Sequence, residues 1–132
     1  MYKKITMINP KSEEIEVEFL ANAATPLRYK SIFKRDLLTQ FANAKIDGPD
    51  GTTSLNIDFL PELAFIMAMQ AKALDDKEIK LDKLNENSLM DWLEGFDSFS
   101  FEDKAEEILD VYYGNSETTS ESKKNKEEQT EK

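Results

Sequence analysis

The residues that could carry out acid–base chemistry in this chain are neighbouring carboxylates. Adjacent pairs occur at Asp75-Asp76, Glu102-Asp103 and Glu106-Glu107. A glycosidase-like site needs two carboxyl groups that face each other across a cleft, with burial raising the pKa of one of them. Adjacent residues point to different sides of a helix, and these pairs lie among polar residues. The pairs therefore predict solvent-exposed faces, not a catalytic site.

Other catalytic and ligand-binding signatures are missing from the sequence. There is no cysteine and no histidine, so thiol chemistry, the usual zinc ligand and the usual proton shuttle are excluded. The glycine-rich signatures of phosphate loops, dinucleotide sites and hydrolase elbows do not occur. Segment 46–54 contains aspartate and glycine, but it lacks the EF-hand spacing and predicts a loop. We therefore expect a protein that is not an enzyme and that has no cofactor or metal.

The element expected to organise the fold is a helix over residues 58–74. Its sequence, DFLPELAFIMAMQAKAL, places apolar residues on nearly every side of the helix, which is typical of a buried helix. It is too short, and carries too many charges, to span a membrane. Asp58 is expected to cap the first turn, where Pro61 is tolerated.

A β-hairpin is expected over residues 3–21. Its second strand alternates apolar and acidic residues: Ile15, Val17 and Phe19 against Glu14, Glu16 and Glu18. An isolated hairpin is marginal in water, so the apolar face should rest on helices. An unpaired edge could recruit a strand of another chain, and the glutamates would oppose this. Because the chain starts with this strand, no secretory signal peptide is expected.

Three further helices are expected, at about 26–44, 88–95 and 101–113. In the first, aromatic and aliphatic residues recur at steps of four after an N-cap at Thr25. A break near residues 31–34, giving two helices, is the alternative. Ser88 and Ser100 are each followed three residues later by an aspartate, which predicts a capping box for the second and third helices.

Together these elements predict one domain at residues 1–114 of the mainly α (α+β) class. The N-terminal hairpin should pack on a bundle of about four helices around the buried central helix. Residues 115–132 contain no apolar residue, so burial cannot offset the entropy of ordering them. We expect them to form a disordered polar tail.

The net charge of −10 is unevenly distributed. Residues 1–46 carry 8 basic and 5 acidic residues, whereas residues 47–114 carry 5 and 17. A domain with this excess of acidic residues would repel the phosphate backbone of a nucleic acid. Nucleic-acid binding is therefore disfavoured. Solubility explains the charge best. The alternative is a homo-oligomer in which a basic face of one copy meets an acidic face of the next.

The segment 95–101, GFDSFSF, places three phenylalanines across the connection between two helices. The interpretation we favour is that all three rings pack into the core. The alternative is an adaptable apolar contact for a partner. Met67, Met69 and Met90 leave the same two interpretations open, because flexible thioethers both fill cores and line binding surfaces.

A family resemblance is carried by the run TPLRYKSIFKRDLL at 25–38, the apolar helix LAFIMAMQA at 63–71 and MDWLEGF at 90–96. Over about residues 3–113 the chain resembles the tail assembly chaperones of long-tailed phages (siphophages) and prophages of Gram-positive bacteria. The order of elements and the spacing R-Y-x-x-x-F-x-x-D-L-L carry the likeness. Many relatives have glycine after the phenylalanine of that run, where this chain has Lys34.

The resemblance implies a function that composition permits but does not reveal. Such chaperones are thought to bind the long tape measure protein, keep it soluble and help recruit the major tail tube protein. The chain would then work in the cytoplasm of the bacterial host and be absent from the mature virion. The candidate partner-binding residues are Tyr29, Phe33, Phe96 and Phe99.

Two functions of other classes remain as alternatives. An acidic regulator could mimic nucleic acid and block a DNA-binding enzyme of the host, with carboxylates spaced like phosphates on one face. A hydrolase that uses carboxylates and a divalent metal would need an acidic cluster inside a pocket. The chaperone is the function that we expect.

Overall fold

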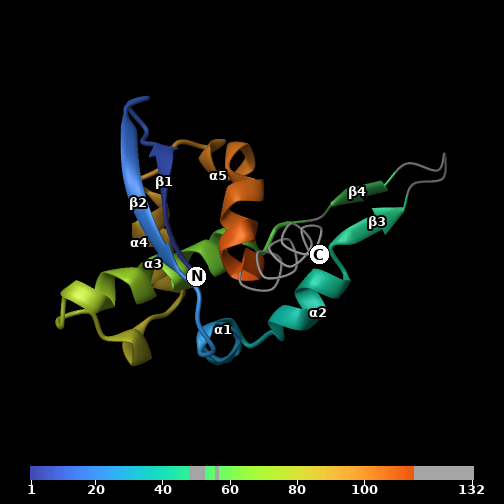
Figure 1. The fold of residues 1–132 in the computed structure, drawn as a ribbon, viewed down its shortest axis with the longest axis horizontal. Helices are drawn as coiled ribbons and strands as arrows, with labels where there is room; N and C mark the ends of the chain where they lie inside the picture. The colour runs from blue at the N-terminus through green and yellow to red at the C-terminus, as the bar shows by residue number, and fades with distance from the viewer. Residues whose placement is uncertain (48–52, 56, 115–132) are drawn as a thin grey trace, which may run out of the picture.

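A long helix, α3 (Leu60–Asp75), is the central element of the computed structural model, and the N-terminal hairpin and several of the helices pack around it (Figure 1). The structure describes residues 1–47, 53–55 and 57–114, with 45–47 and 53–55 described as backbone alone. In chain order the other elements are β1 (Tyr2–Ile8), β2 (Glu14–Leu20), α1 (Thr25–Phe33), α2 (Leu37–Ala42), β3 (Lys45–Asp47), β4 (Thr53–Leu55), the short 3-10 helix η1 (Leu81–Lys83), α4 (Glu86–Leu93) and α5 (Ser100–Asp103). Residues 105–114 form a last helix.

This architecture confirms the predicted mainly α, α+β class with an N-terminal hairpin. The predicted tail at 115–132 lies outside the described residues. Helix α3 is buried as expected, since ten of its 16 residues are inaccessible to solvent. The only polar side chain among those ten is Gln70. The predicted cap at Asp58 is wrong: Phe59 precedes the helix and makes no side-chain cap, although Pro61 does lie in the first turn.

The hairpin pairs β1 with β2 in antiparallel register, from Tyr2 opposite Leu20 to Ile8 opposite Glu14. A hydrogen bond of 2.7 Å from the Met1 amino group to the Ala21 carbonyl oxygen continues the ladder. Alternate residues of both strands form the inner face, in which Ile5, Met7 and Phe19 are fully buried. This apolar face packs on α3, so the hairpin is supported by helix packing as the sequence predicts.

The predicted helix 26–44 is two helices, which is the alternative that the sequence left open. Helix α1 ends at Phe33, and Lys34 adopts a left-handed conformation with φ 61°. Helix α2 begins after Asp36, whose carboxylate accepts the amide hydrogen of Thr39 at 3.1 Å. An aspartate favours such a cap over a mid-helix position, which explains why the chain breaks here.

Three of the predicted N-terminal caps are also wrong. Thr25 is the first residue of α1, and its hydroxyl oxygen accepts the Asn22 amide hydrogen. Helix α4 begins two residues before Ser88, in a capping box formed by Asn85 and Ser88. Ser100 is the first residue of α5 and does not cap it. Its hydroxyl oxygen accepts the amide hydrogen of Ile8 at 3.0 Å. The Thr25 and Ser100 hydroxyls accept hydrogen bonds from residues outside their own helices, and short sequence motifs do not reveal such bonds.

Two further boundaries differ from the prediction. The helix expected at 101–113 is interrupted at Lys104, so that α5 and the last helix are separate. The loop expected at 46–54 is flanked by β3 and β4, which pair in antiparallel register with Ile46 opposite Ser54. Strands of three residues are too short to produce a recognisable alternation. Residues 48–52 of that segment lie outside the described residues.

Replacing Lys34 with glycine tests the break between α1 and α2. The left-handed conformation costs a residue with a side chain roughly 1 kcal/mol, and glycine adopts it without that cost. We expect Lys34→Gly to raise the free energy of unfolding, measured in urea, by up to about 1 kcal/mol. The matched control is Lys30→Gly inside α1, which should lower it by about 1 kcal/mol. Equal losses in both variants would contradict a left-handed Lys34.

Candidate functional site

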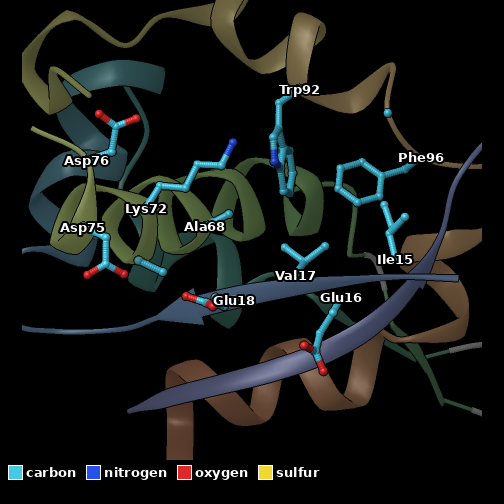
Figure 2. Close-up of a pocket in the computed structure, with 12 residues that line it drawn as sticks. Ile15, Glu16, Val17, Glu18, Ala68, Lys72, Asp75, Asp76, Trp92 and Phe96 are labelled. Carbon is cyan, nitrogen blue, oxygen red and sulfur yellow. The ribbon is translucent and has the colours of Figure 1, made fainter. Parts of the chain in front are cut away.

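The candidate site is a groove of about 520 Å³ that lies between β2, α3 and the end of α4 (Figure 2). We refer to it as the β2 groove. Its lining residues are Ile15, Glu16, Val17, Glu18, Ala68, Ala71, Lys72, Asp75, Asp76, Trp92, Gly95 and Phe96. The groove opens at the surface, so a partner could enter without a rearrangement of the core.

The apolar walls of the β2 groove come from three elements. Ile15 and Val17 project from the inner face of β2 toward Trp92 and Phe96, as Figure 2 shows. On α3 the facing residues include Ala68 and Ala71, whose short side chains leave the space unfilled. These small residues are the local reason for a groove beside an otherwise buried helix.

Aromatic contacts hold the α4 wall of the groove in place. The rings of Trp92 and Phe96 meet edge to face with centroids 4.7 Å apart. Behind them, Trp92 also contacts Phe65 of α3 and Phe101 of α5, each at a centroid distance of 5.6 Å. Contacts of this kind add about 0.5–1.5 kcal/mol per pair beyond the burial of area. The wall is therefore rigid and positioned before any partner binds.

Charge around the groove is mainly negative. Four carboxylates line it, those of Glu16, Glu18, Asp75 and Asp76, against one cation, Lys72. Figure 2 shows the Glu16 carboxylate pointing away from Trp92. Because side chains alternate along a strand, Glu16 and Glu18 lie on the opposite face of β2 from Ile15 and Val17. An apolar interior with an acidic rim favours an occupant that is apolar on one side and basic on the other.

The edge of β2 that is not paired with β1, its outer edge, lies along the groove. The reciprocal hydrogen bonds between Met1 and Ala21 fix the ladder register, so Val17 and Ile15 bond to β1. The backbone groups of the alternate residues then point outward, away from β1: those of Glu14, Glu16 and Glu18. Within the described part of the chain, none of these outward groups has a hydrogen-bond partner.

Gln70 closes the same edge at its far end. The side-chain amide of this buried residue donates to the Leu20 carbonyl oxygen at 2.8 Å and to the Thr25 hydroxyl at 2.9 Å. Its own carbonyl oxygen accepts from the Arg28 guanidinium at 2.8 Å. Because Leu20 is the next outward-facing residue after Glu18, the accessible edge stops where α3 meets β2.

A second polar set joins α1 to α3 away from the groove. The Tyr29 hydroxyl donates to the Glu62 carboxylate at 2.6 Å, and Arg35 forms an ion pair with the same carboxylate. Burial, followed by the hydrogen bond to Glu62, raises the pKa of Tyr29 well above its ordinary value. The phenol is therefore neutral at physiological pH and serves as a hydrogen-bond donor.

The structure places the four candidate binding residues in different environments. Tyr29 and Phe33 are buried, with ring centroids 5.2 Å apart, and offer no surface to a partner in this conformation. Phe96 lines the β2 groove, whereas Phe99 is 64% exposed outside it. Of the three phenylalanines in segment 95–101, Phe101 is buried and Phe96 packs on the core, so the expectation that all three are buried fails at Phe99.

The adjacent carboxylates lie mostly at the surface, as the sequence predicts. Asp75, Asp76, Glu102, Asp103 and Glu106 are exposed. Glu107 is half-buried and lies 3.8 Å from Lys3 and 3.4 Å from Lys104. Among the described residues, no three acidic side chains are grouped so that they could hold a metal ion.

Sequence reasoning did not identify the β2 groove. It expected the strand glutamates to protect an unpaired edge, and it placed Trp92 within the helix expected at 88–95. Neither pattern shows that the two elements face each other across Ala68 and Ala71, because that contact is long-range. A usable signal was the alanines of the apolar helix, Ala68 and Ala71 among them, since small residues mark a place where space is left.

Comparisons with protein-family models, curated proteins and solved structures find no match to this chain. Among the described helices, none has the length and apolar content needed to cross a bilayer.

Replacing Gln70 tests its role in closing the edge of β2. In Gln70→Met the Leu20 carbonyl and the Thr25 hydroxyl lose a buried partner, which should lower the free energy of unfolding by about 1–3 kcal/mol. Gln40→Met is the matched control, because Gln40 is half-buried and makes no side-chain hydrogen bond within the described residues. It should change stability by less than about 0.5 kcal/mol. Similar values for the two variants would exclude this role for Gln70.

The raised pKa of Tyr29 predicts a loss of stability in alkali. The unfolded chain ionises this phenol near its ordinary pKa of about 10, while the folded chain keeps it neutral. The stabilisation is therefore complete below about pH 10 and decreases as the pH rises above it. Urea unfolding at about pH 8 and about pH 11 should show a smaller decrease for Tyr29→Phe than for the parent chain. An unchanged pH dependence would contradict the buried, hydrogen-bonded phenol.

Proposed function

We propose that this protein is a binding protein of phage tail morphogenesis, a tail assembly chaperone that binds and solubilises the tape measure protein. The observation that carries the proposal is the β2 groove, an open apolar surface with a preformed aromatic wall. Exposed apolar surface of this kind is typical of sites where one protein binds another. The resemblance of residues 25–38 and 90–96 supplies the identity of the partner.

The conformation of Lys34 adds support for the family. Many members of the resembled family carry glycine at the position after the phenylalanine of the run, and here that position has φ 61°. A left-handed residue is where glycine is favoured. A motif glycine and a left-handed backbone at one position agree with a shared break between two helices.

The proposed mechanism is reversible shielding. Several copies would cover apolar stretches of the extended tape measure protein, and major tail tube subunits would displace them as the tube grows. The net charge of −10 would keep such a coated complex in solution. The site of action would be the cytoplasm of the bacterial host, with the chaperone absent from the finished virion. Self-association into a homo-oligomer is compatible with this mechanism.

The alternative of a nucleic-acid mimic receives less support from the hairpin. A mimic needs an uninterrupted row of carboxylates on one face. On the outer face, Glu18 lies opposite Lys4 and Glu16 opposite Thr6, so cations and neutral residues are interleaved with the acids. We also do not propose that the protein binds nucleic acid directly.

Co-expression with the tape measure protein encoded in the same genome tests the function. We expect the tape measure protein to be insoluble when expressed alone, and to be soluble and co-purified when this chain is present. Because apolar contacts dominate, the complex should persist from about 0.1 to about 0.5 M salt, where exposed charge pairs are screened. Absence of both solubilisation and co-purification would refute the proposal. Salt-sensitive binding to a basic DNA-binding enzyme would favour the mimic instead.

A further inference from the structure

The outer edge of β2 and the β2 groove form one continuous feature. Residues from both faces of the strand line the groove, Ile15 and Val17 from the inner face and Glu16 and Glu18 from the outer face. A groove that touches consecutive residues of a strand lies along its edge, because neighbouring side chains point to opposite faces. The outward backbone groups of Glu16 and Glu18 are thus presented beside an apolar space.

We infer that the β2 groove binds an extended segment of a partner protein, which adds to β2 as a third strand. Backbone hydrogen bonds would form with Glu14, Glu16 and Glu18, whose outward groups have no partner in the described residues. This inference rests on the proposed function and names the class of peptide that the same site recognises.

The register of a third strand fixes the chemistry of its side chains. Residues that lie opposite each other in neighbouring strands share a face of the sheet. Partner residues opposite Ile15 and Val17 would therefore enter the groove, toward Trp92 and Ala68, and should be apolar. Those opposite Glu16 and Glu18 would lie beside carboxylates, and should be lysine or arginine. The expected occupant alternates basic and apolar residues.

A second copy of this chain fits the edge poorly. If two β2 strands paired edge to edge, the row Glu14, Glu16 and Glu18 of one copy would lie against the same row of the other. Like charges directly opposite in a sheet are destabilising. The chain's own residues 115–132 also fit poorly, because they contain no apolar residue to enter the groove. The charge and the apolar space together favour a basic, amphipathic strand from another protein.

A synthetic peptide tests the inference on the full chain. The probe has about nine residues, enough to span β2, in which Lys or Arg alternates with Val or Leu. Trp92 is the single tryptophan of the chain and lines the groove, so its fluorescence should report occupancy by a peptide without tryptophan. We also expect slower hydrogen exchange at the Glu16 and Glu18 amides. A peptide with glutamate at the basic positions should bind at least about tenfold more weakly.

Two proline variants separate strand addition from other modes of binding. The amide of Glu16 points outward, so Glu16→Pro removes an edge donor and leaves the β1–β2 ladder intact. Thr6→Pro is the matched control: Thr6 lies opposite Glu16 and its amide points outward at the other edge of the hairpin. Glu16→Pro should weaken peptide binding at least about tenfold, and Thr6→Pro by less than about twofold. Circular dichroism and thermal melting check that both variants fold.

A charge variant provides a second test that does not depend on proline. Glu16→Lys combined with Glu18→Lys should reverse the preference, so that the peptide with glutamate binds more tightly than the basic one. The control makes the same change of net charge at exposed residues outside the groove, Glu102→Lys with Glu106→Lys, and should keep the original preference.

Several outcomes would overturn the inference. These are absence of peptide binding, equal binding to Glu16→Pro and the parent chain, and binding of the peptide as a helix. The proposed function is judged separately, by co-expression of the tape measure protein. If Glu16→Pro solubilises that protein as well as the parent chain does, the chaperone function stands and strand addition at β2 is refuted.

Discussion

The structure depends on the need to cover a helix that is apolar on every side. Helix α3 has no polar face to turn toward water, so its neighbours must enclose it. The hairpin, α1 and α4 all contact it, and each buried leucine, isoleucine or methionine contributes about 1.5–3 kcal/mol. Ala68 and Ala71 are themselves buried, but their short side chains leave space between the elements that cover α3. At Ala68 and Ala71 the hairpin and α4 lie on either side of the helix without meeting, and the β2 groove is the space that remains.

Gln70 shows how such a helix is placed against a sheet edge. A buried amide has to satisfy both its donors and its acceptor. It does so by bonding to Leu20, Thr25 and Arg28, which belong to β2 and α1. Apolar packing alone would allow the helix to slide along the strand, whereas these directional bonds fix its position. The same bonds set the length of the strand edge that stays accessible.

The sequence predicted the features that rest on periodicity. An alternating strand and a helix without a polar face have short-range signals, so the hairpin and α3 were found nearly at their true limits. Helix ends were predicted less well, because several residues compete for each cap. At α4, Asn85 takes the cap position where Ser88 was expected, and no side chain caps α1 although Thr25 has a suitable hydroxyl. Nothing in the local pattern of apolar residues marks the left-handed conformation of Lys34.

Most of the candidate site could not be predicted from the sequence, for a different reason. A step of four residues marks Tyr29 and Phe33 as one face of a helix, but it does not say whether that face meets solvent or the core. In the fold it meets the core, because Glu62 of α3 accepts the Tyr29 hydroxyl hydrogen. Conversely, the row of Glu14, Glu16 and Glu18 suggests a protected strand edge, but only the fold shows which edge of β2 is unpaired and that a groove lies beside it. The function of a strand edge is a property of topology, which local patterns do not encode.

The glutamates of β2 then have two consequences that follow from one charge pattern. An unpaired edge beside an apolar groove would ordinarily promote self-association and aggregation. A row of three carboxylates makes pairing with another copy unfavourable, since the rows would face each other. The same row attracts a strand that carries the opposite charge. The edge can therefore remain unpaired without promoting self-association, because the charge that excludes other copies of the chain is the charge that would select the basic partner proposed above.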